Sequence, residues 1–171
     1  MTSATSRSGG DFLAKKSDVN RLRKQLPPLK DVLVVEDEAL DAERMKATLR
    51  VMFGYDLDVR RAATAASAVD CVLERRPELV FLDDILKPSD TATHTIPFLR
   101  RADYGGPIIV ISGQVTRNRR TALMAAGADE VIHKDDLDSV RLAEALIRVL
   151  GEAGPAAPTA SPEKAARKKK S

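Results

Sequence analysis

The sequence predicts an α/β fold, a doubly wound five-stranded parallel sheet with helices on both faces. Short apolar runs alternate five times with segments of helical periodicity between residues 31 and 152, as in chains that build parallel sheets. Three of these runs, at 31–35, 79–82 and 107–112, are apolar almost throughout, which is typical of strands buried on both faces. Right-handed crossovers then restrict the topology to a few arrangements.

The individual elements follow from local signals. Strands are predicted at 31–35, 57–62, 79–82, 107–112 and 130–133. The first helix, over 39–53, carries an apolar face and ends at Gly54. The second, over 66–76, ends before Pro77. A short third helix is expected to begin near Thr95 with Pro97 in its first turn. Two further helices are predicted at 116–126 and 138–152.

Charge divides the chain into three parts: a basic N-terminal extension over 1–30, partly disordered or helical, a folded domain over 31–152, and a disordered basic tail over 153–171. Residues 1–30 carry a net charge of +5 and residues 155–171 carry +4, whereas residues 31–154 carry −6. The tails could reach nucleic acid through its phosphates. They contain a single aromatic residue, Phe12, so nucleic acid is an unlikely partner compared with proteins.

Other composition signals argue for a cytoplasmic protein. No segment approaches eighteen consecutive apolar residues, so no membrane span is expected. The N-terminal residues lack the apolar core of a secretory signal. Cys71 is the single cysteine, which excludes an internal disulfide and fits a reducing compartment.

Polar residues follow four of the predicted strands at the point where each strand ends. They form the sets Glu36-Asp37-Glu38, Asp83-Asp84, Ser112-Gly113 and His133-Lys134. In open α/β sheets, ligands bind beyond the carboxyl ends of the strands. Four chemically complementary sets at one edge therefore predict a functional site there.

The residue types of these sets suit phosphoryl transfer. Carboxylates about 4 Å apart repel by roughly 4 kcal/mol per pair at an effective dielectric constant near 20. Three converging acids therefore favour a hard divalent cation with oxygen ligands such as Mg²⁺. A carboxylate beside Mg²⁺ can attack a phosphoryl group and form an aspartyl phosphate. Ser112 could then bond one phosphoryl oxygen, and Lys134 could hold another as a point charge.

The segments "VLVVEDE", "PELVFLD", "PIIVISG" and "AGADEVIHK" resemble the receiver domain of two-component response regulators, over roughly residues 31–150. The resemblance implies the strand order 2-1-3-4-5 and a single-domain regulator. It implies that Glu36, Asp37 and Asp83 hold Mg²⁺, that an aspartate accepts the phosphoryl group, and that Ser112 and Lys134 act as switch residues. It also implies a histidine kinase or histidine phosphotransfer protein as donor, and no enzymatic activity beyond self-directed phosphoryl transfer and autodephosphorylation. The downstream target is an unknown protein, and a homodimer is possible.

Two adjacent aspartates compete for the acceptor role. Receivers typically read P-D-L-V-L-L-D-x-x-L-P, and placing this pattern without gaps puts Asp83 on the acceptor position. The alternative register selects Asp84 and breaks the upstream match. Neighbours on a strand point to opposite faces, so only one carboxylate can aim at the metal. We favour Asp83 and expect Asp84 to face the mouth of the site.

Departures from the family pattern keep other interpretations open. Lys134 is followed by Asp135-Asp136 instead of proline, and Val131 stands where receivers commonly carry an aromatic residue. A degenerate receiver that acts as a phosphate-independent interaction module is therefore the first alternative. A Mg²⁺-dependent phosphatase of the haloacid-dehalogenase type is less expected. The arginines at 117, 119 and 120 are expected to form a solvated face.

Overall fold

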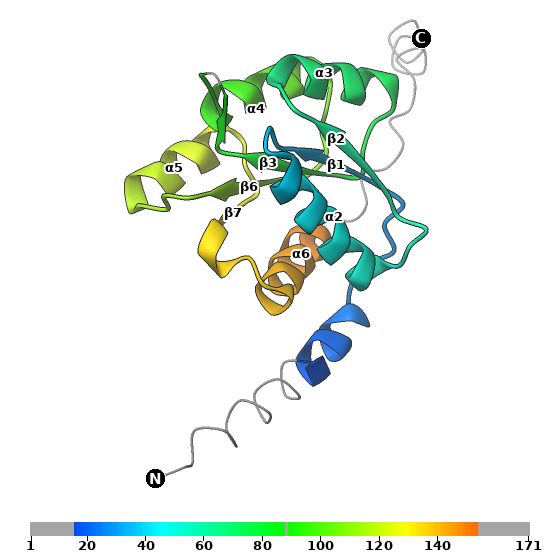
Figure 1. Ribbon diagram of the computed structural model, residues 1–171. Coiled ribbons are helices and arrows are strands. Elements are labelled where there is room, and N and C mark those ends of the chain that lie inside the picture. The colour runs from blue at the N-terminus through cyan, green and yellow to red at the C-terminus, as the bar shows by residue number, and fades with distance from the viewer. Residues whose placement is uncertain (1–15, 88, 154–171) are drawn as a thin grey trace, which may run out of the picture.

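The structure, a computed structural model, describes residues 16–87 and 89–153. Its main sheet has five parallel strands: β1 (Asp31–Val35), β2 (Asp58–Ala62), β3 (Leu79–Asp83), β6 (Ile108–Ser112) and β7 (Glu130–His133). Their order across the sheet is β2-β1-β3-β6-β7, shown in Figure 1. The predicted fold class and the strand order implied by the family resemblance are both confirmed.

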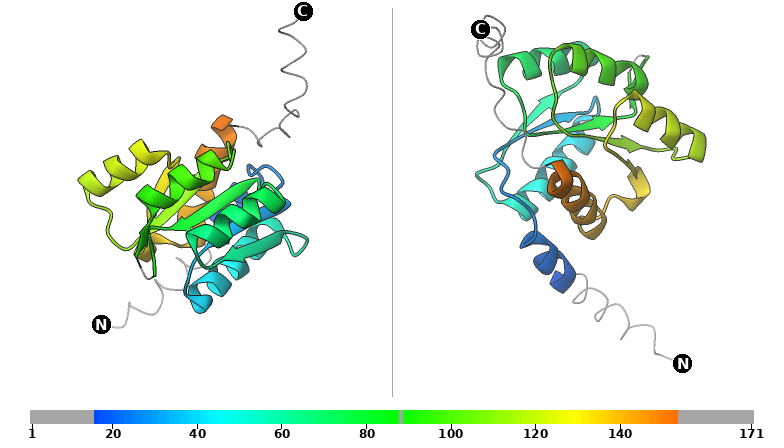
Figure 2. Two further views of the ribbon diagram at one scale, coloured as in Figure 1. Left: turned by 90° about the horizontal axis from the view of Figure 1, so that it is seen from above. Right: turned by 180° about the vertical axis from the view of Figure 1, so that it is seen from behind.

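Five helices cover the two faces of this sheet. They are α2 (Ala39–Phe53), α3 (Ala65–Glu74), α4 (Ala92–Arg101), α5 (Arg117–Ala126) and α6 (Ser139–Ala153). α2 and α6 lie on one face, and α3, α4 and α5 lie on the other (Figures 1 and 2). Among residues 16–87 and 89–153, none of the helices combines the length and the apolar character that crossing a bilayer requires.

The core consists of two apolar layers separated by the sheet. Because strand side chains alternate between faces, Val32 and Val34 pack toward α2 and α6, whereas Leu33 and Val35 pack toward α3 and α4. All five residues of β1 are buried, as are all five of β3 and β6. The three central strands are thus covered on both sides, which explains why their sequences are apolar almost throughout.

The third helix of the predicted series begins earlier than expected. α4 starts at Ala92 rather than near Thr95, so that Pro97 is its sixth residue instead of lying in the first turn. The backbone N–H of Ala92 donates to the carbonyl of Asp84 at 2.8 Å, and the Thr95 hydroxyl donates to the carbonyl of Thr91. These bonds satisfy polar groups of the first turn and permit the earlier start.

A small hairpin before α4 was not predicted. β4 (Ile85–Leu86) and β5 (Asp90–Thr91) pair as a two-stranded antiparallel sheet directly after β3. At two residues each, the strands are too short to show period-two alternation in the sequence. The hairpin carries the chain from the end of β3 into α4.

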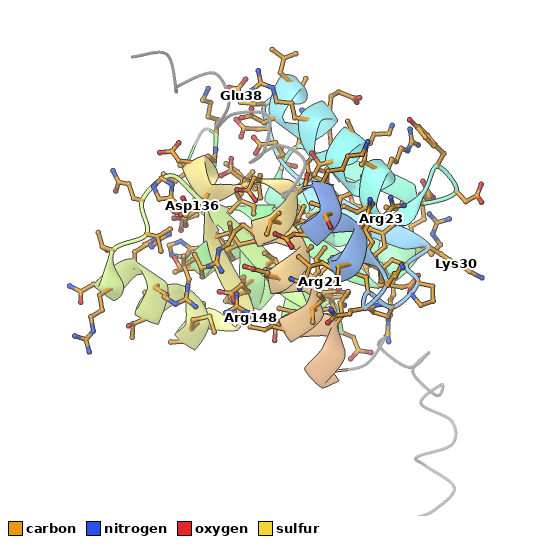
Figure 3. All side chains as sticks on the ribbon, turned by 90° about the horizontal axis from the view of Figure 1, so that it is seen from below. Arg21, Arg23, Lys30, Glu38, Asp136 and Arg148 are labelled. Atoms are coloured by element: carbon orange, nitrogen blue, oxygen red, sulfur yellow. The ribbon has the colours of Figure 1, made fainter. Side chains whose placement is uncertain are left out.

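The N-terminal extension contacts the domain. Residues 16–23 are helical, and Leu22 and Leu26 pack against the core layer beneath α2 and α6. Arg23 Nε donates to the carbonyl of Met52, at the end of α2, at 3.0 Å. Figure 3 shows Arg21 and Arg23 on this helix, seen from below in front of α6 and α2. The disordered tail predicted over 153–171 lies outside the described residues except for Ala153, which ends α6. Residues 1–15 of the predicted extension over 1–30 also lie outside the described residues.

Candidate functional site

The carboxyl ends of β1, β3, β6 and β7 meet at one edge of the sheet. The strand register pairs Asp83 with Ile111, and Ser112 with His133. β1 lies on the other side of β3, so Glu36, which follows β1, comes next to Asp83. The structure therefore brings the four polar sets to a common edge, where the sequence placed them.

Strand alternation decides which polar side chains face one another. Three strand residues pack toward α2 and α6: Val34, Phe81 and Ile132. The residues two positions further along, Glu36, Asp83 and Lys134, continue to the same side. They line a cavity of about 240 Å³ that reaches down to Met45 and Thr48 of α2.

Three carboxylates converge at this edge of the sheet. Glu36, Asp37 and Asp83 each offer an oxygen atom, and these atoms lie within 4.8 Å of one another. Glu36 and Asp83 are buried, and Asp37 is half-buried. Arg61 of β2 fixes the backbone of this segment, since its guanidinium donates to the carbonyls of Glu36 at 3.0 Å and Asp37 at 2.8 Å.

Lys134 is the cation nearest to the acids among the described residues. Its Nζ lies 3.4 Å from Asp83 Oδ1 and 3.5 Å from Asp83 Oδ2. Burial alone would lower the pKa of Lys134, but the charges of Asp83 and Glu36 outweigh burial and raise it. Lys134 is therefore a permanent positive charge at the carboxylate of Asp83.

One lysine does not balance three acids. Burial, with further contributions from Asp83, raises the pKa of Glu36 to about 7. Burial also raises the pKa of Asp83, despite the opposing effect of Lys134. With the three acids ionised, the site carries two uncompensated negative charges. Its donor atoms are all oxygens, so the residues present fit a hard divalent cation, with Glu36, Asp37 and Asp83 as ligands.

Asp84 lies on the opposite side of the sheet from Asp83. The Ser112 hydroxyl donates to Asp84 Oδ2 at 2.8 Å. Arg119 Nε donates to the same oxygen at 3.0 Å, and Arg119 Nη2 pairs with Asp84 Oδ1. Asp84 is only 3% exposed. The expectation that Asp84 faces the mouth of the site is therefore wrong, because strand alternation turns it toward β6 and α5.

The arginines of α5 also differ from expectation. Arg117 is exposed, as predicted. Arg119 pairs with the buried carboxylate of Asp84, and Arg120 pairs with that of Glu130 at 2.9 Å. Helical periodicity of α5 does not reveal these contacts, because the acidic partners lie on other elements. The sequence does place the carboxylates of Asp84 and Glu130 where they would be buried, and a buried carboxylate needs a cationic partner.

The loop after β7 takes an unexpected form. In place of a Lys-Pro turn, residues 134–136 form the 3₁₀-helix η1 (Lys134–Asp136). The backbone N–H of Asp135 donates to His133 Nδ1 at 3.0 Å, which caps this turn. Val131 is 1% exposed and belongs to the core layer beneath α3 to α5. The position at which receivers commonly carry an aromatic residue is therefore part of the core in this structure.

Comparison with known proteins identifies the family. The family model described as the response regulator receiver domain matches residues 32–147. Over 103 residues, the chain is 29% identical to the probable transcriptional regulatory protein TcrX of Mycobacterium tuberculosis, covering 60% of this chain and 42% of TcrX. It is 32% identical to the DNA-binding response regulator MtrA of Mycobacterium leprae, covering 60% of this chain and 44% of MtrA. The match thus spans less than half the length of these relatives.

Solved structures agree on the fold. The chemotaxis protein CheY4 of Vibrio cholerae superposes with a TM-score of 0.63 at 21% identity, covering 71% of this chain and 99% of CheY4. The receiver domain of the sensor histidine kinase PA1611 of Pseudomonas aeruginosa, solved with a magnesium ion coordinated in its active site cleft, gives 0.61 at 22% identity, covering 73% and 99%. Together with the family model over residues 32–147, these likenesses establish that the chain belongs to the response regulator receiver domain family of two-component systems.

Proposed function

We propose that the chain accepts a phosphoryl group on Asp83 from a histidine kinase or a histidine phosphotransfer protein and signals by protein contact or relay. One observation carries this assignment. The carboxylate of Asp83 shares the cavity with Glu36 and Lys134 and lies close to that of Asp37. The carboxylate of Asp84 is bound by Ser112 and Arg119 instead. Asp83 is the aspartate that has both cationic support and access from the cavity.

The transfer itself is a displacement at phosphorus. An oxygen of the Asp83 carboxylate forms a bond to phosphorus while the bond from phosphorus to the imidazole nitrogen of the donor histidine breaks. The released imidazole keeps the electron pair and takes up a proton. Lys134 Nζ, 3.4 Å from Asp83 Oδ1, holds a phosphoryl oxygen as negative charge moves onto the aspartate, which is the positioning and charge neutralisation that this chemistry requires.

Mg²⁺ is the cation that we assign to the acids of the site. Glu36, Asp37 and Asp83 would hold it, because their oxygens lie within 4.8 Å of one another and Mg²⁺ prefers carboxylates together with phosphate oxygens. When bound, it would neutralise charge on the transferring phosphoryl group. Arg61 keeps two of these ligands in place through the carbonyls of Glu36 and Asp37.

The output of the phosphorylated chain is proposed to be a protein contact. Phosphorylation adds close to two negative charges at the sheet edge, and the adjacent surface would repack around them. TcrX and MtrA carry names that refer to transcription and DNA binding, but the match covers less than half of each. Binding of nucleic acid by this chain remains less expected than binding of protein, and a homodimer and a cytoplasmic location stay predictions.

Two alternative functions, a phosphatase and a phosphate-independent receiver, have less support. Membership of the receiver family leaves the haloacid-dehalogenase type of phosphatase without support. A phosphate-independent receiver would not need a lysine beside a buried aspartate, so the pairing of Lys134 with Asp83 speaks against it. The reaction proposed here is self-directed and ends in autodephosphorylation, so no separate substrate is turned over.

Labelling with a small phosphodonor tests the assignment. Wild type, Asp83→Asn and Asp84→Asn are incubated with phosphoramidate and Mg²⁺, and intact-mass spectrometry follows the addition of a phosphoryl group. We expect one added group in wild type and in Asp84→Asn, and none in Asp83→Asn. Loss of labelling in Asp84→Asn alone would move the acceptor to Asp84. A wild-type chain that is not labelled by phosphoramidate or by a partner kinase would contradict the proposal.

A further inference from the structure

Asp84 joins three elements at the edge of the proposed phosphorylation site. It follows β3 directly. Its Oδ2 accepts a hydrogen bond from the hydroxyl of Ser112 at the end of β6. Both of its carboxylate oxygens also pair with Arg119 in the first turn of α5. Its backbone N–H also donates to the carbonyl of Ile111 at 2.9 Å. The buried carboxylate thus receives hydrogen bonds from the Ser112 hydroxyl and from two nitrogen atoms of Arg119, which satisfy it and fix its position.

The hydroxyl of Ser112 has a single proton to donate. The charged Asp84 Oδ2 at 2.8 Å is a closer acceptor than the carbonyl of Gln114 at 3.1 Å. The position of Ser112 at the end of β6, next to β3, also suits its hydroxyl to donate to a phosphoryl oxygen on Asp83, as the sequence suggests, and that bond would use the same proton. Ser112 can therefore serve Asp84 or the phosphoryl group, but not both at once.

Arg119 determines where the carboxylate of Asp84 lies. The guanidinium binds both of its oxygens in a bidentate pair, a geometry that fixes orientation as well as distance. The backbone of Arg119 is placed by the cap of α5, because its N–H donates to the hydroxyl of Thr116 at 3.1 Å. Asp84 is thus a fixed acceptor, so Ser112 must break its hydrogen bond in order to turn toward Asp83.

We propose that Asp84, oriented by Arg119, competes with the phosphoryl group of Asp83 for the Ser112 hydroxyl and thereby weakens the phosphorylated state. Asp84 and Arg119 are positioning residues in this scheme, since they act through Ser112. The inference rests on the proposed phosphorylation of Asp83. It adds that the residue next to the acceptor sets how tightly the site holds a phosphoryl group.

Beryllofluoride, which mimics a phosphoryl group on an aspartate, measures this competition at equilibrium. Its dissociation constant is determined in the presence of Mg²⁺ by titration calorimetry for wild type, Ser112→Ala, Asp84→Ala and the double variant. Net hydrogen bonds to charged groups correspond to about tenfold or more in an equilibrium constant. We expect Asp84→Ala to bind about tenfold more tightly than wild type. Ser112→Ala should change the dissociation constant by less than about twofold when Asp84 is present. In the Asp84→Ala background, the same replacement should raise the dissociation constant about tenfold.

The dependence on Ser112 separates competition from a purely structural effect. Tightening that persists without the hydroxyl, for instance because a released Arg119 reaches the phosphoryl mimic, would overturn the inference. No tightening in Asp84→Ala would overturn it as well. Arg119→Gln, which loosens Asp84, should show a smaller gain that also requires Ser112. Arg117→Gln, an exposed arginine of the same turn, is the matched control and should bind as wild type does.

A second Asp84 variant and the behaviour of wild type complete the test. If Asp84→Ala does not fold, as judged by circular dichroism, Asp84→Asn carries the same cycle. Its amide oxygen accepts a hydrogen bond without a charge, and the expected gain is then about two- to threefold. If wild type binds no beryllofluoride and takes up no phosphoryl group, the proposed function itself fails. If wild type binds it and the Asp84 variants bind equally well, only the competition is refuted.

Discussion

Lys134 Nζ lies 3.4 Å from Asp83 Oδ1, a pairing between residues 51 positions apart in the sequence. This lysine is the charge that we expect to stabilise the transferring phosphoryl group. Lys134→Gln should therefore reduce the initial rate of labelling by phosphoramidate about 100-fold, as expected for the loss of a transition-state donor. Mass spectrometry of timed samples measures the rate. Lys87→Gln is the control, because Lys87 is exposed and pairs with Glu38 instead, and an equal loss in that variant would contradict this role of Lys134.

Metal affinity should depend on the three converging carboxylates. Replacing Asp37 by Asn or Glu36 by Gln removes one charge from the set whose oxygens lie within 4.8 Å of one another. We expect the dissociation constant for Mg²⁺, measured by titration calorimetry, to rise at least about tenfold in each variant. Glu38→Gln should change it less than about threefold, since Glu38 is exposed and bound to Lys87. Unchanged binding in Asp37→Asn would remove that residue from the ligand set.

Glu130 should make stability depend on pH on the acid side. Burial tends to raise its pKa, but the backbone N–H of Val131 and the guanidiniums of Arg120 and Arg148 hold it below the usual range. A lowered folded-state pKa contributes stability that is complete above the unfolded-state pKa, about 4.3, and is lost as the pH falls through the folded-state value. The free energy of unfolding of wild type should therefore fall between about pH 5 and 3.

Glu130→Gln tests this assignment. At pH 7 the variant should be destabilised by about 1–3 kcal/mol in urea unfolding, and its further loss on acidification should be smaller than that of wild type. Glu144→Gln, on the exposed side of α6, is the control and should follow the wild-type profile. Parallel pH profiles of wild type and Glu130→Gln would refute the assignment.

Gly127 ends α5 in a conformation that other residues rarely adopt. Its φ is 116°, and a Cβ atom there would lie 3.1 Å from Cγ2 of Ile96. Gly127→Ala should therefore lower the free energy of unfolding by about 1–3 kcal/mol. Gly105→Ala serves as the control, because a Cβ atom at that position meets nothing within 4 Å. Equal stability of the two variants would show that the backbone at 127 relaxes.

The sequence was sufficient for the fold because its central strands are apolar on both faces. The same alternation rule explains the grouping of Glu36, Asp83 and Lys134, each two positions beyond a residue that faces α2 and α6. Applied to Ser112, the rule would also have paired it with Asp84. An inward carboxylate indicates that some cation must pair with it, but the sequence does not identify Arg119 as that cation, because the contact joins positions 35 residues apart on different elements. The hairpin after β3 escaped prediction because its strands have two residues each.

The contact of the N-terminal helix with the core bears on how the chain should be trimmed for experiments. The family match begins at residue 32 and ends at residue 147, yet Leu29, Val149 and Leu150 are among the buried apolar residues, and Leu22 and Leu26 pack against them. A fragment cut at the family boundaries would therefore expose apolar residues of the core layer beneath α2 and α6 to water. The hydrophobic core of the described chain thus extends beyond both ends of the segment that the family model matches.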